Sequence, residues 1–127
     1  GDKYLLLKDR LGVVCAVGEG QLTEDGHPSF CPVGRDWFVT DTYPDKKHFR
    51  TLMLYNMNDH RIRKVGKFYS LPNRTYNLPE SWDLSEMRSD LHPRWSRDGK
   101  RVCIDSVHEG TKQMYVVDVS DIVINNK

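Results

Sequence analysis

The sequence has no long apolar run, almost no net charge and few cysteines. No stretch approaches the roughly 18 apolar residues that span a membrane, and the 127 residues carry a formal net charge of +1. This balance gives no electrostatic reason to expect nucleic acid or an acidic membrane as a partner. Cys15, Cys31 and Cys103 are odd in number and widely spaced, which argues against a disulfide framework or a Cys-x-x-Cys metal site. We therefore expect a globular domain that binds neither nucleic acid nor membrane.

Motifs for several enzyme classes are also missing. The sequence has no Gly-x-Ser-x-Gly nucleophile motif, no P-loop and no dinucleotide-binding fingerprint. Its first residues, GDKYLLLKDR, do not have the pattern of a secretory signal peptide. We therefore expect no serine-nucleophile or nucleotide-binding chemistry, and the compartment stays open between cytoplasm and periplasm.

The sequence contains two copies of one unit. The stretch DGHPSFCPVGRDWFVTDTYPD aligns in its first part with DLHPRWSRDGKRVCIDSVHEG, so that His27 matches His92 at an offset of 65 residues. Further on, RTLMLYNMND, which starts at Arg50, matches KQMYVVDVSD, which starts at Lys112, at an offset of 62 residues. Self-similarity at a nearly constant spacing indicates a repeat architecture.

Each copy has the pattern of short antiparallel strands. Runs rich in β-branched and aromatic residues alternate with turns, and the Asp-Gly pair in RDGK is typical of a tight hairpin. The strands expected in the second copy are RWSR, RVCIDSV, QMYVVDV and, as the fourth, VSDIVI, which covers Val119–Ile124. Four antiparallel strands per repeat form the blade of a β-propeller. The sequence therefore predicts an all-β fold, a partial β-propeller of about two four-stranded antiparallel blades plus part of a preceding blade.

The blades divide the chain into consecutive parts. We expect a partial blade over residues 1–24, a blade over 25–67, an insertion over 68–90 and a second blade over 91–127. Closed propellers have about 4–8 blades, and an open stack leaves sheet edges and faces uncovered. We therefore expect the chain to associate with copies of itself or with the remaining blades of a parent propeller.

The repeat resembles a known blade family. HPRWSRDGKRVCIDSVHEGTKQMYVVDVSD is similar to the TolB-type, WD40-like blade. Within that class, DGHPSF…DTYPD followed by RSDLHPRWSRDG is most similar to the oligogalacturonate lyase group of seven-bladed propellers. This resemblance implies metal-dependent β-elimination, or binding, of oligogalacturonate-type uronates by a parent protein, with a divalent metal such as manganese and no activity in the fragment alone. The same blades also occur in non-catalytic TolB-like modules that bind protein or carbohydrate, which is the alternative function.

The lyase resemblance also implies metal ligands. The family holds its metal with three histidines and a glutamine, partly from a Gln-x-x-His-x-His-Pro run, and the matching run here is MRSDLHP. His92 matches the histidine before proline, while Asp90 stands in place of the other histidine and Met87 in place of the glutamine. His27, the same position one blade earlier, is the candidate for the remaining histidine. Two imidazoles and a carboxylate can ligate a hard divalent ion, so the implied ligands are His27, Asp90 and His92, with catalytic residues unassigned.

Propeller geometry gathers further polar residues near these ligands. Loops that enter the first strand of a blade, and loops that join its second and third strands, emerge on one face beside the central channel. The residues expected there to bind an acidic oligosaccharide are Tyr43, His48, Arg88 and His108. For His27 and His92 a purely structural role at the start of the blade stays open beside metal or substrate contact. Asp41 and Asp105, at the ends of their second strands, are expected to form turn or inter-blade hydrogen bonds.

Overall fold

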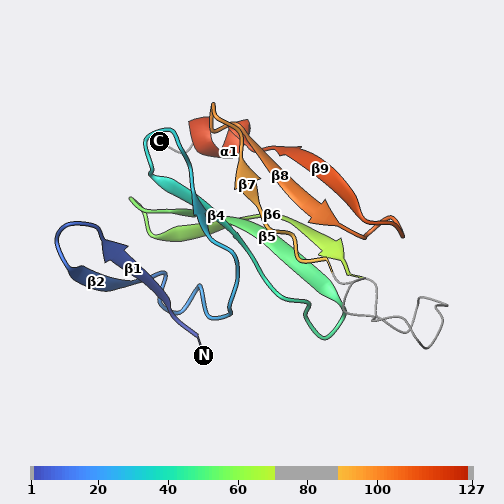
Figure 1. Cartoon of the computed structure of the whole chain (residues 1–127), viewed down its shortest axis with the longest axis horizontal. Helices are drawn as coiled ribbons and strands as arrows, with labels where there is room; N and C mark the ends of the chain where they lie inside the picture. The colour runs from blue at the N-terminus through green and yellow to red at the C-terminus, as the bar shows by residue number, and fades with distance from the viewer. Residues whose placement is uncertain (1, 71–88, 126–127) are drawn as a thin grey trace.

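The computed structural model describes residues 2–70 and 89–125, and these form three antiparallel sheets packed side by side (Figure 1). The elements in chain order are β1 (Tyr4–Lys8), β2 (Val13–Val17), β3 (Ser29–Phe30), β4 (Trp37–Asp41), β5 (Phe49–Asn56), β6 (Arg61–Tyr69), β7 (Arg94–Trp95), β8 (Arg101–Ser106), β9 (Gln113–Asp118) and α1 (Ser120–Asn125). The first sheet is the β1–β2 hairpin, the second is β3-β4-β5-β6 and the third is β7-β8-β9. No closed ring of sheets is formed by the residues described.

The second sheet contains the four antiparallel strands that the first repeat predicts. Each strand pairs with the next in chain order, as in a meander. β6 runs to Tyr69 and so extends two residues into the segment 68–90 that the sequence predicts as an insertion. Most of that segment, residues 71–88, lies outside the described part of the chain.

The predicted fourth strand of the second repeat is wrong. Ser120–Asn125 forms the helix α1, and the third sheet has three strands. Asp118 caps this helix, because its Oδ1 accepts the backbone N–H of Ser120 at 2.8 Å. Val119 and Ile122, three positions apart, both pack against the core between the second and third sheets. The segment is buried on one side, as a strand would be, but its apolar period is that of a helix.

The β7–β8 connection has the predicted Asp-Gly turn. Gly99 adopts a φ of 70°, and its N–H donates to the Ser96 carbonyl at 3.0 Å. Asp98 accepts the N–H of Lys100 at 3.0 Å, which closes the turn from the other side. A Cβ on Gly99 would lie 2.7 Å from Sγ of Cys31, beside β3. Glycine is therefore needed both for the turn and for the close approach of the third sheet to the second.

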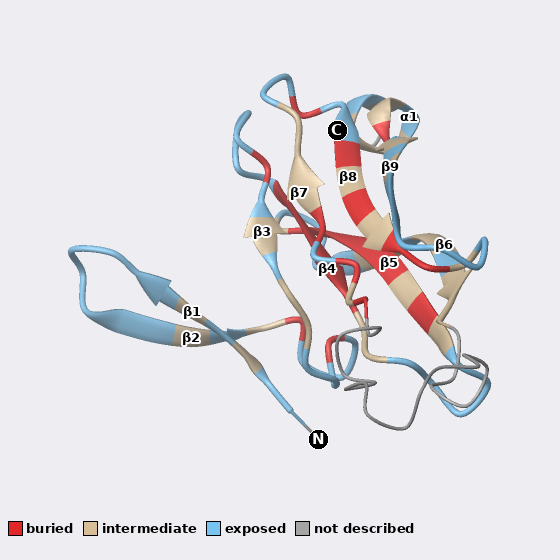
Figure 2. Cartoon of the chain, turned by 45° about the vertical axis from the view of Figure 1, so that its right-hand side comes forward, coloured by how far each residue is buried: buried red, intermediate tan, exposed pale blue. Residues whose placement is uncertain are grey.

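The main core lies between the second and third sheets. Its buried members are Cys31, Trp37, Val39, Leu52, Leu54, Leu91, Val102, Ile104 and Val119. A smaller cluster around Phe38, Met53 and Tyr55 covers the opposite face of the second sheet and reaches the first hairpin through Tyr4 and Val17. Figure 2 shows the consequence: β4 is buried along its length and β5 along most of it, whereas the first hairpin is largely exposed. The second sheet is thus the centre of the molecule.

Two further properties belong to the described part of the chain. None of its helices is long and apolar enough to cross a membrane. The three cysteines are free thiols, with Cys31 buried and Cys15 and Cys103 partly exposed.

Four aspartates at turns make the fold sensitive to acid. Their pKa values lie below the ordinary value because of the backbone N–H of Phe49 for Asp45, the guanidinium of Arg63 for Asp59, the hydroxyl of Ser96 for Asp98 and the hydroxyl of Ser120 for Asp118. A carboxyl group with a lowered folded-state pKa stabilises the fold above its unfolded pKa, and this contribution is lost as the pH falls through the folded pKa. We therefore expect the urea midpoint to be lower at about pH 3 than at about pH 7. An unchanged midpoint, measured by circular dichroism, would contradict this.

Candidate metal centre

The candidate site lies where the second and third sheets meet, at the end of β4 and the start of β5. Residues 25–28 lead into β3 and residues 89–93 lead into β7, so two equivalent segments enter their sheets here. His27 and His92 occupy the same repeat position on these segments. Just beyond them, Nε1 of Trp95 donates to the carbonyl of Ser29 at 2.8 Å and ties β7 to β3. The repeat therefore brings together two histidines that are far apart in sequence.

Three side chains converge at this point. One potential ligand atom from each of His27, Asp90 and His92 lies within 4.8 Å of the other two. The imidazole rings of His27 and His92 stack, with centroids 4.0 Å apart and an interplanar angle of 27°. Nε2 of His92 lies 3.8 Å from Oδ2 of Asp90. These are the three residues that the sequence predicts as metal ligands.

A buried carboxylate holds both histidine segments. Asp41, the last residue of β4, is 1% exposed. Its Oδ1 accepts the backbone N–H of His27 at 2.8 Å, and its Oδ2 accepts the backbone N–H of His92 at 3.2 Å. Nδ1 of His27 lies 3.0 Å from the same Oδ1 and 3.1 Å from Oδ2. Asp41 therefore forms the inter-sheet hydrogen bond expected of it and contacts the His27 ring as well.

The backbone around the two histidines is tightly constrained. A Cβ on Gly26 would lie 2.1 Å from the Asp41 carbonyl oxygen and 2.6 Å from the Tyr4 hydroxyl, so only glycine lets His27 approach β4 this closely. His92 has a φ of 44°, in the left-handed region that non-glycine residues rarely adopt. Such a conformation costs about 1–3 kcal/mol and persists only where its surroundings enforce it. For His92, the hydrogen bond to Asp41 is one such constraint.

Asp90 is fixed by a buried arginine. Nη1 of Arg50, near the start of β5, donates to Oδ1 of Asp90 at 2.5 Å, and Nε of the same guanidinium donates to Oγ of Ser70 at 3.2 Å. The Arg50 side chain is almost fully buried, and Asp90 is mostly buried. A buried charge requires a partner, because its desolvation is costly. The ion pair leaves Oδ2 of Asp90 as the oxygen directed toward His92.

The charges at this site favour a cation. Asp41 and Asp90 are both acidic, Arg50 is basic, and the two imidazoles add no charge when neutral. The sum over these five groups is therefore negative. A divalent cation would be attracted to this negative charge, whereas an anion would be repelled by it.

The spacing of the donors also fits a metal ion. Two ligand atoms at roughly 2.0–2.3 Å from one divalent ion lie at most about 4.6 Å apart, and the three atoms here already lie within 4.8 Å of one another. Two imidazoles and one carboxylate can hold such an ion with positions left over for water or substrate.

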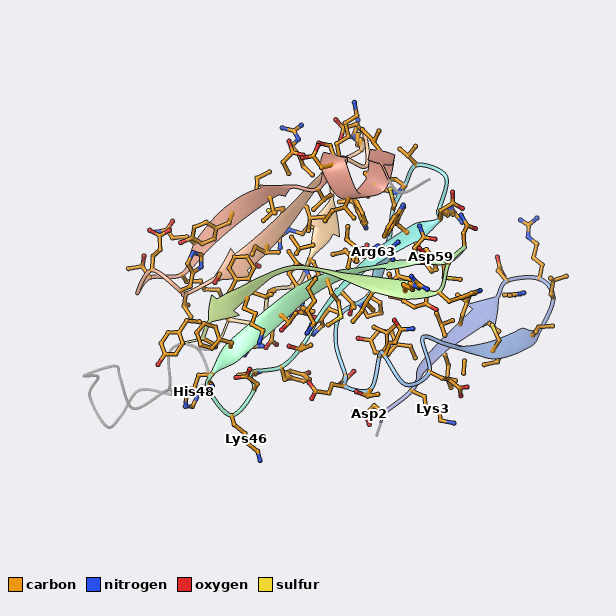
Figure 3. The ribbon with its side chains drawn as sticks, turned by 180° about the vertical axis from the view of Figure 1, so that it is seen from behind. Asp2, Lys3, Lys46, His48, Asp59 and Arg63 are labelled. Carbon is orange, nitrogen blue, oxygen red and sulfur yellow. The ribbon has the colours of Figure 1, made fainter. Side chains whose placement is uncertain are left out.

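Two of the predicted substrate-binding residues lie at the same end of the second sheet. Tyr43 follows β4, and its ring centroid is 6.1 Å from that of His27 in an edge-on contact. His48 lies in the β4–β5 turn, far along the sheet from the β5–β6 turn that holds Asp59 (Figure 3). Arg88 lies outside the described residues.

The fourth predicted substrate contact, His108, is packed between sheets. Its ring centroid is 5.3 Å from that of Phe68 on β6 and 4.4 Å from that of Tyr115 on β9. Nδ1 of His108 is 2.7 Å from Oγ of Ser106. These contacts place His108 between the second and third sheets, and none of them involves His27, Asp90 or His92.

Sequence reasoning missed Arg50, although a signal for it was present. Arg50 stands in the run FRTLMLYN, at the same alternation as Leu52 and Leu54, both of which face the third sheet. A charged residue on the inward face of an apolar strand must be buried with a partner. What the sequence could not supply was the identity of that partner, Asp90, which lies 40 residues away.

Comparison with known proteins adds no assignment: no protein-family model, no curated protein and no solved structure matches the chain.

Proposed function

We propose that this chain is part of a TolB-like β-propeller of the oligogalacturonate-lyase type and contributes a divalent metal site formed by His27, Asp90 and His92. The observation that carries the proposal is the convergence of these side chains, from two neighbouring sheets, to within 4.8 Å. The repeated unit and the side-by-side antiparallel sheets support the propeller part of the proposal. Manganese or a similar divalent ion is the proposed cofactor.

The proposed substrate is an oligogalacturonate or a related uronate. A divalent ion at this site would acidify the proton alpha to the uronate carboxylate. In β-elimination a base removes that proton, a carbon–carbon double bond forms, and the glycosidic oxygen departs from the neighbouring carbon. The proposed sugar and carboxylate contacts are Tyr43, His48, Arg88 and His108. The base stays unassigned.

Calorimetric titration of the metal-free chain with Mn²⁺ tests the metal site directly. We expect saturable binding of one ion, and heats that change when oligogalacturonate is added. Absorbance of the conjugated double bond in unsaturated uronate products tests catalysis in a protein with all its blades. Absence of saturable binding for Mn²⁺, Zn²⁺ and Ni²⁺ alike would contradict the metal site, whatever the outcome for catalysis.

A non-catalytic module that binds protein or carbohydrate is the second candidate, and two exposed apolar side chains on the outer face of the third sheet favour it. Met114 and Val116 on β9 are 69% and 65% exposed. Their repeat equivalents on β5, Leu52 and Leu54, are both 0% exposed, because the third sheet covers them. In this molecule, the equivalent face of the second sheet is therefore covered by another β-sheet.

A second copy of the chain offers a matching surface. On the first hairpin, Leu5 and Leu7 pair in register with Ala16 and Val14, so these four side chains share one face. Leu5, Leu7 and Val14 are exposed, while Tyr4 on the opposite face packs toward the second sheet. We propose that the outer face of the first hairpin of one copy packs on the outer face of the third sheet of another, head to tail.

Substitution of the third sheet's outer face should block this association. We expect the unaltered chain to increase in mass with concentration in light scattering, and the double variant Met114→Lys, Val116→Lys to stay monomeric, because two ammonium groups would be buried in the contact. The control variant Lys112→Met, Thr111→Lys keeps the charge of the β8–β9 turn and should associate like the parent. A chain that is monomeric at all concentrations would contradict the proposal.

A further inference from the structure

We propose that Asp41 is a positioning residue that fixes the tautomer of His27, so that Nδ1 carries the proton and Nε2 presents its lone pair to a metal. This inference rests on the proposed metal site, but the tautomer itself can be measured without any metal. Metal-bound histidines commonly donate their other ring N–H to a carboxylate or carbonyl, which orients the ring and makes the ligand nitrogen more basic.

The geometry of Asp41 makes it an acceptor. Oδ1 receives the backbone N–H of His27 at 2.8 Å, and Oδ2 receives the backbone N–H of His92 at 3.2 Å. Each carboxylate oxygen accepts a hydrogen bond from a backbone N–H, which can only donate. The carboxylate therefore acts as an acceptor toward the His27 ring as well. Nδ1 of His27, at 3.0 Å, must then be the donor. In a neutral imidazole this leaves Nε2 unprotonated.

Burial strengthens this arrangement. The Asp41 side chain is 1% exposed, whereas the His27 side chain is 31% exposed. Water therefore competes little for the carboxylate but can reach the imidazole. A hydrogen bond to a charged acceptor is stronger than a neutral one, and it is stronger still where water is excluded. The outer part of the ring stays accessible to a ligand.

The same carboxylate sets the spacing of the two rings. Asp41 binds the backbone of His27 on the way into the second sheet and that of His92 on the way into the third. The two imidazoles then stack with centroids 4.0 Å apart. Asp41 therefore sets both which nitrogen of His27 carries the proton and how far apart the two imidazole rings lie.

The repeat supplies a matched comparison. Asp105 lies one residue before the end of β8, near the position that Asp41 holds at the end of β4, and Arg94 donates to it through Nη2 at 3.0 Å and through Nη1 at 3.2 Å. Its other hydrogen bond within the described residues runs from its backbone N–H to the carbonyl of Leu91 at 2.9 Å, and none of these bonds involves a histidine. The role assigned to Asp41 therefore does not belong to every blade; it belongs to the position where two histidine segments meet.

The test is a measurement of the His27 tautomer by ¹⁵N nuclear magnetic resonance, at a pH where the imidazole is neutral. We expect the Nδ1–H form in the parent chain. In Asp41→Asn, an NH₂ donor replaces one of the two oxygens that lie 3.0 and 3.1 Å from Nδ1, and the negative charge is lost, so the population of the Nδ1–H form should fall in favour of the Nε2–H form. Mn²⁺ affinity should then fall by about 10–100-fold, as it does when a residue that orients a metal-bound histidine is lost.

The control is Asp105→Asn, which should change neither the tautomer nor the Mn²⁺ affinity. An Nε2–H tautomer in the parent chain would overturn the inference, and so would a folded Asp41→Asn variant with an unchanged tautomer. If Asp41→Asn does not fold, the His27 tautomer measured in the parent chain tests the inference by itself. If the parent chain shows the Nδ1–H form but binds no metal, the proposed function fails and the positioning of His27 by Asp41 stands.

Discussion

Replacing both His27 and His92 by alanine is expected to abolish tight binding of a divalent metal. The two imidazoles supply two of the three converging donor atoms, and Asp90 alone would hold the ion through one carboxylate. We expect the Mn²⁺ affinity to fall by more than the roughly 10–100-fold that follows when a residue orienting a ligand is lost. Titration calorimetry on the parent and the double variant measures this difference.

The fold should tolerate this double substitution. The His27 and His92 side chains are 31% and 56% exposed, so alanine at these positions opens little buried space. His60→Ala is the control, because His60 lies in the β5–β6 turn at the other end of the second sheet. If metal and oligosaccharide binding were unchanged in the double variant while its stability fell, the two histidines would be scaffold. The lyase-like interpretation should then be abandoned in favour of the interaction module.

Replacing Leu54 by alanine is expected to cost about 2–5 kcal/mol of unfolding free energy, the range measured for truncation of fully buried leucines. Leu54 is 0% exposed and lies in the core between the second and third sheets. Its loss removes apolar burial and leaves a cavity that the two sheets can close only by moving together. Urea denaturation followed by tryptophan fluorescence measures the change.

Leu11→Ala makes the same chemical change at a site that is 70% exposed in the β1–β2 turn. We expect it to alter stability by no more than about 0.5 kcal/mol, as is usual for surface substitutions. If the two variants had equal stability, the third sheet would not be packed on the second as the structure has it. The pair therefore tests the sheet packing on which the candidate site depends.

Much of the strand order could be predicted from the repeat. Short apolar runs with turn residues between them gave β3, β4 and β5 in the first copy and β7, β8 and β9 in the second. Such local patterns are reliable because alternation and turn chemistry are properties of neighbouring residues. The helix α1 was missed because a short apolar run does not by itself distinguish a strand from a buried helix. The capping Asp118 and the spacing of Val119 and Ile122 were the signals that favoured a helix.

For the candidate site, the three residues could be predicted from the sequence, but the contacts that hold them could not. His27 and His92 could be paired because the repeat places them at equivalent positions, and Asp90 could be added because it lies two residues from His92. The ion pair of Asp90 with Arg50 could not be predicted. No local pattern connects residues that meet only when two sheets pack.

By itself, the sequence determined that this protein is built from a repeated antiparallel unit and that each unit begins with a histidine next to a proline. Only the tertiary structure decided that one buried carboxylate, Asp41, binds the backbone of both His27 and His92. The physical reason is that strand formation depends on the period of neighbouring side chains, whereas the site depends on the distance and angle between two packed sheets. That distance is set by the whole core between the two sheets, whose residues are spread along the chain from Cys31 to Val123.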